Sequence, residues 1–312
     1  MLASCAAPGK AKSIMDNERT LEFFWTARER EKMRLLRMDG QKRNPPNGAM
    51  REWRYSNVQF SDDKTTQLII DGLTMAGLGN SPKLFGVLVA CRMTNNFVNI
   101  GKYFGTDVAE GWDRDRFVNA LKNSVPTLSM AYKIHTAKGF DKITGIAIVA
   151  DKADARKDEV FGTPFTTTQE LWSRIRKMTK IGDSLAYTLV KDLSLLPIGT
   201  GKCEDVYDWA TLSPPARAVL AWMKQGKDAR WLALYRKPPE MDLELMQELL
   251  ELSTNPKYWP TEWPQWSMMT VAHWLHQYCQ YVKVAYYNIP GRRYVECDSS
   301  YLPINVASTF LH

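Results

Sequence analysis

The stretch MTKIGDSLAYTLVKDL, residues 178–193, indicates the fold more clearly than any other part of the chain. Its spacing predicts one helix that ends before a short turn at Gly182 and a second helix whose apolar face begins at Leu185. Glycine permits close approach at such a turn, and the N–H groups that start the second helix can bind a DNA phosphate. This is the form of a helix-hairpin-helix element. Because Asp183 stands where a second glycine is usual, an ordinary helical hairpin is the alternative.

If the hairpin meets DNA, Lys180, Gly182 and Ser184 are the residues expected to contact it. DNA glycosylases with this element carry a catalytic aspartate downstream of the hairpin, which directs attention to Asp205 and Asp208 in GKCEDVYDWA. Such a carboxylate would stabilise a cationic sugar and assist attack at C1′. A helix N-cap or a place in a solvated loop is the alternative for either residue.

The composition is that of a globular chain, since 45% of the 312 residues are hydrophobic and 24% are charged. A net charge of +7 and eleven tryptophans suit nucleic acid, bound through phosphate neutralisation and stacking on exposed aromatic rings, although +7 is also a common solubility charge. No apolar run approaches the roughly 20 residues that cross a bilayer, so no membrane partner is expected. The five cysteines are scattered without CxxC spacing, which favours a reducing compartment over a disulfide framework.

Residues 1–15 are interpreted as a disordered start, and residues 16–312 as a single mainly α domain, with two lobes meeting at a central cleft as a variant. One strand is predicted at Lys142–Asp151, where β-branched residues follow a turn. Asn255–Trp266 is too rich in Pro and Trp to be regular. Periodicity and capping signals predict helices at Asp16–Met38, Ala49–Leu73, Leu84–Phe97, Asp113–Lys122, Thr168–Thr179, Ser213–Lys224, Met241–Leu252 and Thr270–Tyr287.

The stretch WRYSNVQFSDD, residues 53–63, falls on the second of these helices. Helical spacing would place Arg54, Asn57 and Ser61 on nearly one face. Arg, Asn and Asp together on an otherwise aromatic helix could hold an anion or a base edge, and a solvated face is the alternative.

Two other motifs do not indicate the kind of site that they resemble, a phosphate-binding loop and a metal site. IGTGKC, residues 198–203, lacks the first glycine and the final Ser/Thr of a phosphate-binding loop. His273 and His276 have no nearby acidic or cysteine partners, so no metal site is predicted.

In order along the chain, six blocks resemble those of helical phage proteins that act as amino acid:DNA transferases in thymidine hypermodification, formerly described as α-glutamyl/putrescinyl-thymine pyrophosphorylases. The blocks are FFWTARERE, RYSNVQFSDDKTT, ACRMTN, AYKI, IGDSLAYTLVKDL and VAHWLHQYCQYVKVAYY. The resemblance runs from about Glu22 to Tyr287 and lies in the order of the blocks. It implies a helix-hairpin-helix DNA glycosylase-like fold, here mainly α with a minor β element.

The resemblance also implies a reaction in the cytoplasm of an infected bacterial host. A 5-hydroxymethyluracil of double-stranded phage DNA, activated as a pyrophosphate ester, loses pyrophosphate to an incoming amino acid such as glycine. The residues that match the family's blocks are Arg54, Asn57, Asp62, Asp63, Thr66, Arg92, Asn95, Ala131, Tyr132, Gly182, Asp192, Cys279 and Lys283.

The chain departs from the family's pattern at several positions. Phe60 stands where the family has a second arginine, and Ser213-Pro214-Pro215 stands where it has Gly-Pro-Gly. His276 or a nearby residue, and Gln280, stand where acidic residues are usual. These departures leave a changed substrate or a loss of catalysis as alternatives.

The implied reaction makes demands on particular side chains. Arg54, Arg92, Lys283 or a Mg²⁺ ion would absorb the charge of the leaving pyrophosphate. Asp62, Asp63 or Asp192 would accept the proton of the attacking amine if burial raises the carboxyl pKa. Asn57 and Asn95 would contact the substrate, and Tyr132 or Trp53 would stack on a flipped base.

Three other functions stay open. A true DNA glycosylase would use Asp205 or Asp208, and a non-catalytic DNA-binding accessory protein would need neither. The helical partner of a 5-hydroxymethyluracil DNA kinase is disfavoured because the chain has no phosphate-binding loop.

Overall fold

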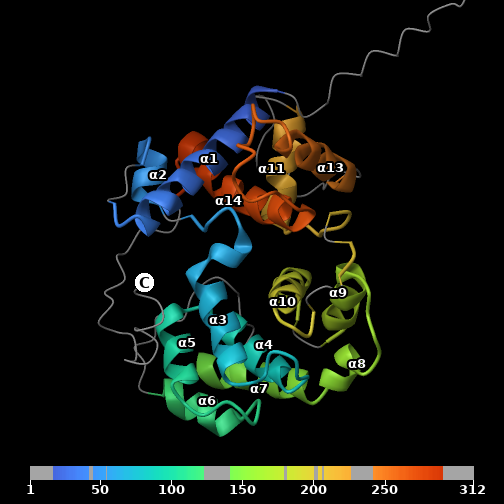
Figure 1. The fold of residues 1–312 in the computed structure, drawn as a ribbon. Coiled ribbons are helices and arrows are strands. Elements are labelled where there is room, and N and C mark those ends of the chain that lie inside the picture. The colour runs from blue at the N-terminus through green and yellow to red at the C-terminus, as the bar shows by residue number, and fades with distance from the viewer. Residues whose placement is uncertain are drawn as a thin grey trace, which may run out of the picture. The chain divides into compact units, whose positions relative to one another are not determined.

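A computed structural model describes residues 17–41, 45–53, 55–122, 141–178, 181–199, 203–205, 207–225 and 242–290. These residues are mainly helical and include no strand (Figure 1). Residues 1–15, interpreted as disordered from the sequence, lie outside the described part. The chain divides into two compact units, one built from Met1–Arg51 with Pro214–Gly291 and the other from Glu52–Ser213 with Arg292–His312.

The first unit is assembled around the longest helix, α1 (Glu18–Met38). Asn17 caps it as predicted, because its side-chain oxygen accepts from the N–H groups of Arg19 at 3.0 Å and Thr20 at 3.1 Å. The indole of Trp274 donates to the carbonyl of Phe23 at 3.2 Å and so ties α1 to the last helix. The other helices of this unit are α2 (Gly48–Glu52), which ends at the boundary, α11 (Pro214–Gln225), α13 (Asp242–Ser253) and α14 (Met268–Tyr287).

The tryptophans of the first unit form its core. Trp222, Trp259, Trp266 and Trp274 are all buried, and edge-to-face contacts join the rings of the first three to neighbouring aromatic rings. No tryptophan of the described ranges is exposed. The four buried tryptophans therefore serve packing, and the other described tryptophans are half-buried.

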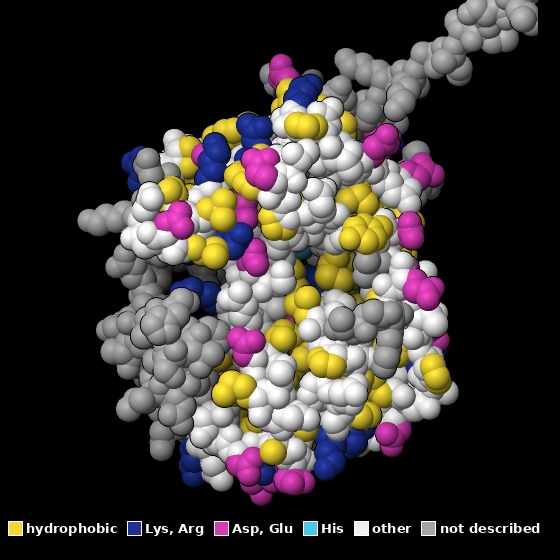
Figure 2. All heavy atoms as spheres, viewed as in Figure 1, with side chains coloured by type: hydrophobic (Ala, Val, Ile, Leu, Met, Phe, Trp, Pro, Cys, Tyr) yellow, Lys and Arg dark blue, Asp and Glu magenta, His cyan; other side chains and the backbone are white. Residues whose placement is uncertain are grey.

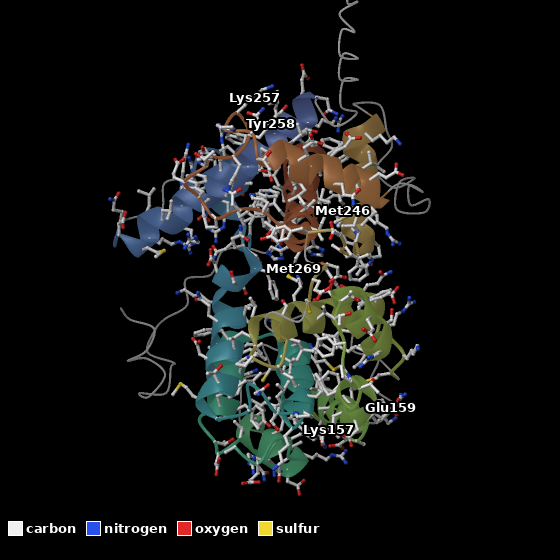
Figure 3. All side chains as sticks on the ribbon, turned by 45° about the vertical axis from the view of Figure 1, so that its right-hand side comes forward. Lys157, Glu159, Met246, Lys257, Tyr258 and Met269 are labelled. Atoms are coloured by element: carbon white, nitrogen blue, oxygen red, sulfur yellow. The ribbon has the colours of Figure 1, made fainter. Side chains whose placement is uncertain are left out.

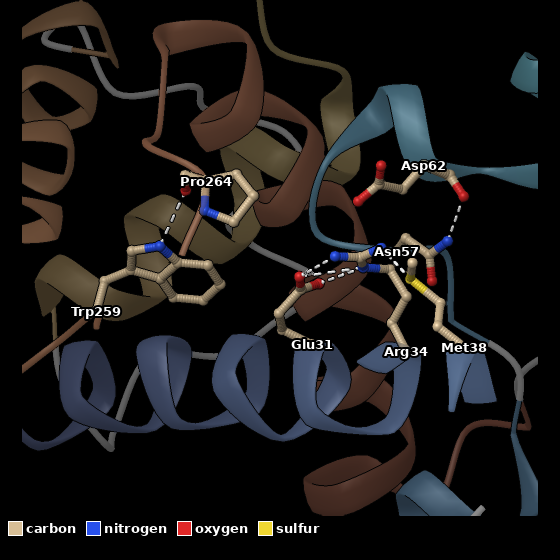
Figure 4. Close-up of polar contacts among 7 residues, drawn as sticks. All are labelled: Glu31, Arg34, Met38, Asn57, Asp62, Trp259 and Pro264. Atoms are coloured by element: carbon tan, nitrogen blue, oxygen red, sulfur yellow. Dashed lines mark hydrogen bonds and ion pairs between the residues drawn. The ribbon is translucent and has the colours of Figure 1, made fainter. Parts of the chain in front are cut away.

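The predicted irregular segment Asn255–Trp266 is confirmed. It is a loop of turns in which the Trp259 indole donates to the Pro264 carbonyl at 3.0 Å (Figure 4). Lys257 lies beside Tyr258 in this loop, with its amine 4.9 Å from the ring centroid (Figure 3). The loop fixes the start of α14, which Ser267 caps by accepting from the N–H of Thr270 at 3.2 Å.

The second unit is built around α4 (Leu84–Thr94), whose residues are all buried. It packs against α3, α5, α7 and α10. Gly86 makes the α7 contact close, because a Cβ there would lie 2.9 Å from the Cβ of Asp154, the last residue of α7. The helical elements of this unit in chain order are η1 (Phe60–Asp62), α3 (Lys64–Met75), α4, α5 (Phe97–Phe104), α6 (Arg114–Leu121), α7 (Lys142–Asp154), α8 (Lys157–Phe161), α9 (Thr168–Arg176) and α10 (Asp183–Leu195).

The predicted strand at Lys142–Asp151, which was the minor β element, is wrong, because this segment is helix α7. Asp141 caps the helix by accepting from the N–H of Thr144 at 2.9 Å. Ile146, Val149, Ala150 and Ala153 are buried at helical spacing against α4 and α6. Burial along one stripe outweighs the β-preference of the branched residues.

The helix predicted at Ala49–Leu73 is also wrong in its middle. α2 ends at Glu52 and α3 begins at Lys64, so the stretch between them is a loop that closes with the single turn η1. The helix predicted at Leu84–Phe97 ends at Asn95, which takes the left-handed conformation with φ 41°. Asparagine tolerates this conformation better than most residues, so it can stop α4.

The other predicted helices are confirmed with small shifts at their ends. They correspond to α6, α9, α11, α13 and α14. On the short helix α8, which was not predicted, Lys157 pairs with Asp154 at 2.9 Å and joins α8 to the end of α7; Figure 3 labels Lys157 and Glu159 on it. None of the described helices has the length and apolar character to cross a membrane.

Candidate functional site

The loop before α3 is held by its own backbone and by one amide side chain. Asn57 is buried, and its amide nitrogen donates to the carbonyl of Asp62 (Figure 4). The N–H of Asp63 donates to the carbonyl of Phe60 at 3.2 Å and ends η1. Asn57 therefore shapes the turn that brings Phe60 into the core. The predicted helical face of Arg54, Asn57 and Ser61 does not exist, and Arg54 lies outside the described residues.

A buried ion pair lies next to this turn. The guanidinium of Arg92, on α4, donates through Nε and Nη2 to the two carboxylate oxygens of Asp192, on α10. Nη2 also donates to the hydroxyl of Thr66, on α3, at 2.9 Å. The side chains of Arg92 and Asp192 are 3% and 0% exposed. Three residues that come from separate blocks of the sequence therefore meet in the core of the second unit.

Phe60, the residue in place of the family's arginine, faces two cations. The Lys191 amine lies 3.9 Å from the centroid of its ring, and the guanidinium carbon of Arg92 lies 5.0 Å from it. Cations in this range are attracted to the negative face of an aromatic ring. Positive charge is thus present around the ring that replaces the expected arginine.

One buried cluster is formed by Phe60, Thr66, Arg92, Lys191 and Asp192. Lys191 is the member that the sequence did not indicate. It is 7% exposed, and the ring of Tyr187, one turn earlier on α10, has its centroid 5.7 Å from the amine. Within the described residues no hydrogen bond or ion pair reaches the Lys191 amine. The signal in the sequence was the i, i+4 spacing from Tyr187, which places Lys191 at the edge of the apolar face of α10.

The electrostatics of Lys191 follow from its burial. Desolvation by burial, together with the nearby charge of Arg92, lowers the pKa of the Lys191 amine to about 7, against the opposing effects of Asp192 and Asp63. Burial also raises the pKa of Asp192, against the effect of the Arg92 guanidinium. An amine with a pKa near neutrality can hold or release a proton at physiological pH, which an ordinary lysine does not.

The two aspartates of the opening loop differ from Asp192. Asp62 and Asp63 are both half-buried, and Asp63 occupies the N-cap position of α3 without a capping hydrogen bond from its side chain. Asp63 is close enough to act electrostatically on both Lys191 and Asp192. Asp63 therefore lies at the solvent-facing side of this cluster.

The helical hairpin is present as α9 and α10. Gly182, Asp183 and Ser184 are exposed at the start of α10, and Lys180 lies outside the described residues. A Cβ at Gly182 would meet nothing within 4 Å, and its φ is −81°. The protein itself therefore does not require glycine there. The carboxylate of Asp183 pairs with Arg176 at 3.2 Å, and this negative charge at the helix start opposes anion binding.

Asp205 caps a helix. Its carboxylate oxygens accept from the N–H of Thr168 at 2.6 Å, the hydroxyl of Thr168 at 2.9 Å and the N–H of Gln169 at 3.1 Å. These groups start α9, so the side chain fulfils the cap that was the alternative to a catalytic role. Asp208 lies three residues further along the same exposed loop.

The remaining predicted residues belong to other elements or lie outside the described residues. Asn95 ends α4 and is half-buried. Lys283 belongs to α14 of the first unit, where its carbonyl accepts from the N–H groups of Asn288 and Ile289. Tyr132 lies outside the described residues. No group of three or more His, Cys, Asp or Glu side chains suited to a metal ion occurs in the described part of the chain.

The arrangement can do two things chemically. Asp192 and Thr66 hold the Arg92 guanidinium in a fixed orientation, which makes it a preorganised positive charge. Lys191 supplies an amine that can exchange a proton near neutral pH. Comparison of the chain with protein-family models, with curated proteins and with solved structures finds no match.

Proposed function

We propose that this protein is a DNA base-hypermodification transferase. In this proposal it displaces pyrophosphate from an activated 5-hydroxymethyluracil in phage DNA with an amino acid such as glycine, in the cytoplasm of an infected bacterium. A helix-hairpin-helix DNA glycosylase-like arrangement of the second unit belongs to the same proposal.

The observation that carries the proposal is the convergence of Thr66, Arg92 and Asp192. The resemblance assigns each of them to a different block, and 26 and 100 residues separate Arg92 from its two partners. A chance resemblance would give no reason for these residues to share one buried cluster. Buried charges destabilise a fold unless they are paired, so such clusters are more common where chemistry requires them.

The chemistry of the proposed reaction fits this cluster. Pyrophosphate leaves as a polyanion, and a fixed cation close to the breaking C–O bond stabilises the charge that develops on oxygen. Arg92 has a fixed orientation because Asp192 and Thr66 hold it. Arg54, Lys283 and a Mg²⁺ ion are the further candidates for this role.

The test uses DNA that carries 5-pyrophosphoryloxymethyluracil, incubated with the protein and mixed amino acids and then digested to nucleosides for mass spectrometry. The expected product is a nucleoside with an amino acid joined to the 5-methylene carbon. Asp192→Asn should lower its yield at least 100-fold, because the guanidinium loses its carboxylate partner. Lys157→Met, on α8, serves as the control and should retain the wild-type yield.

The same digest separates the alternative functions. Abasic sites in place of an amino-acyl nucleoside would identify a glycosylase, although both oxygens of Asp205 cap α9. Binding of this DNA without any product would identify an accessory protein. Either result would rule out the transferase.

A further inference from the structure

Among the described residues, the buried amine of Lys191 has no hydrogen-bond or ion-pair partner. Unpaired charges in a protein interior are strongly disfavoured, so such an amine tends to be neutral. The rings of Phe60 and Tyr187 flank it at 3.9 Å and 5.7 Å. The nearby Tyr187 hydroxyl is also buried without a partner in the described residues. Two polar groups on one turn of α10 thus have no hydrogen-bond partner in the part of the chain that the structure describes.

The predicted proton acceptors are less suited to that role. Both oxygens of Asp192 accept from Arg92, so a proton on either oxygen would break the ion pair. Asp63 lies at the start of α3, where it is half-buried and in contact with solvent. Lys191 is the one group of this cluster that is both basic and shielded.

An alternative role for Lys191 is to bind an anion as a permanent cation. The charges that act on the amine are Arg92 from α4, Asp63 from the start of α3 and Asp192 from α10. Two of these three groups are negative, so they repel a second anion beside Lys191. The surroundings therefore favour proton transfer over anion binding at this position.

We propose that Lys191 is the base that removes the proton from the attacking amine in the transferase reaction. This inference rests on the proposed function and specifies which side chain carries out the proton transfer. It replaces the aspartates expected from the sequence in that role.

The proposed step is a proton transfer followed by displacement of pyrophosphate. The neutral Lys191 amine takes one proton from the ammonium group of the amino acid, which leaves a neutral amine with a free electron pair. That pair forms a C–N bond to the 5-methylene carbon while the C–O bond breaks and its electrons leave with pyrophosphate. The product nitrogen is a secondary ammonium that keeps its two remaining protons, and Lys191 returns the proton it took to water.

The test compares two nucleophiles in wild type, Lys191→Met and Lys191→Arg. Glycine is protonated at neutral pH and needs the base, whereas hydroxylamine is a weakly basic amine that is already neutral. With glycine, both variants should be slower than wild type by about 10²-fold or more, the usual effect of a lost general base. With hydroxylamine, the loss should be less than about tenfold. Arginine is informative because it keeps the charge but cannot accept a proton.

The pH profile gives a second readout. The wild-type rate with glycine should rise as the pH passes through about 7, where Lys191 loses its proton, and the variants should lack this rise. Lys157→Met controls for removal of a lysine elsewhere in the unit, and thermal melting confirms that each variant is folded.

The experiment distinguishes a failure of the role of Lys191 from a failure of the proposed function. Equal losses with glycine and hydroxylamine would show a structural role for Lys191, and unchanged rates would show no role; either would overturn the inference while the proposed function stands. An inactive wild-type protein would overturn both.

Discussion

At the scale of the residue, Lys191 should destabilise the fold that contains it. In the unfolded chain a lysine stays protonated up to about pH 10, whereas in the fold burial lowers the pKa of Lys191 to about 7. Between these pH values folding releases a proton, so the free energy of unfolding rises with pH. Below about pH 7 the amine is protonated in both states and the full penalty is present.

Lys191→Met should therefore stabilise the protein, because methionine fills a similar volume without a charge. The expected gain in the free energy of unfolding is up to about 4 kcal/mol at pH 7, and it should shrink as the pH approaches 10. Denaturant unfolding of both proteins across this range measures the difference, and other titrating groups cancel in the comparison. Lys157→Met should show no such pH-dependent gain. A less stable Lys191→Met variant at pH 7 would contradict the penalty.

Some residues of the cluster could be predicted from the sequence and others could not. Arg92 and Asp192 could be singled out because each stands in a block whose order along the chain is informative. Their pairing could not be predicted, since it depends on how α4 packs against α10. Lys191 was missed because periodicity treats a lysine beside an aspartate as solvated surface, and only the packed rings of Phe60 and Tyr187 show otherwise.

At the scale of the element, the secondary structure predicted from the sequence was wrong where the local preference of the residues differs from the conformation that tertiary packing favours. The branched residues of α7 favour a strand in a short window, and only burial against α4 and α6 selects the helix. Residues 53–63 have helical spacing of polar groups, but the Asn57 amide satisfies a backbone carbonyl within a loop. Long helices with clear caps, such as α1, were predictable because local and tertiary signals agree there.

The start of α9 gives a prediction at this scale. Asp205→Ala removes the acceptor of two backbone N–H groups and one hydroxyl at the first turn of the helix. The free energy of unfolding should fall by about 1–2 kcal/mol, an effect similar to losing an N-cap, although the N-cap residue Thr167 still accepts from the N–H of Glu170. Asp208→Ala, in the same loop, should change it by less than about 0.5 kcal/mol. Equal stability of the two variants, measured by denaturant unfolding, would show that the cap contributes nothing.

At the scale of the whole molecule, the charge of +7 is compatible with DNA but does not locate a binding surface. In the view of Figure 2, Lys and Arg side chains over α1 lie among Asp and Glu side chains and form no single basic patch. The start of α10 is the other candidate, and the Asp183 carboxylate weakens it. Gly182 allows a test of the surface at the start of α10. A Cβ there meets no described residue within 4 Å, so an added side chain would interfere only with a bound partner.

Gly182→Ser isolates that question. Serine is a good N-cap, and the added side chain enters open space at an ordinary φ of −81°, so the free energy of unfolding should change by less than about 0.5 kcal/mol. If a DNA phosphate approaches the hairpin closely, the variant should lose one phosphate contact. The slope of log K against log salt should then fall by about 0.9 for duplex DNA.

Gly48→Ser is the matched control, since a Cβ at Gly48 also meets nothing within 4 Å. Its salt dependence should equal that of wild type in a fluorescence anisotropy titration. The same slope for Gly182→Ser would exclude the hairpin as a phosphate contact, because the serine side chain would stand in the way of a phosphate that approaches the backbone closely. DNA would then have to bind another surface, and the open position beside Gly182 would reflect an ordinary helical hairpin.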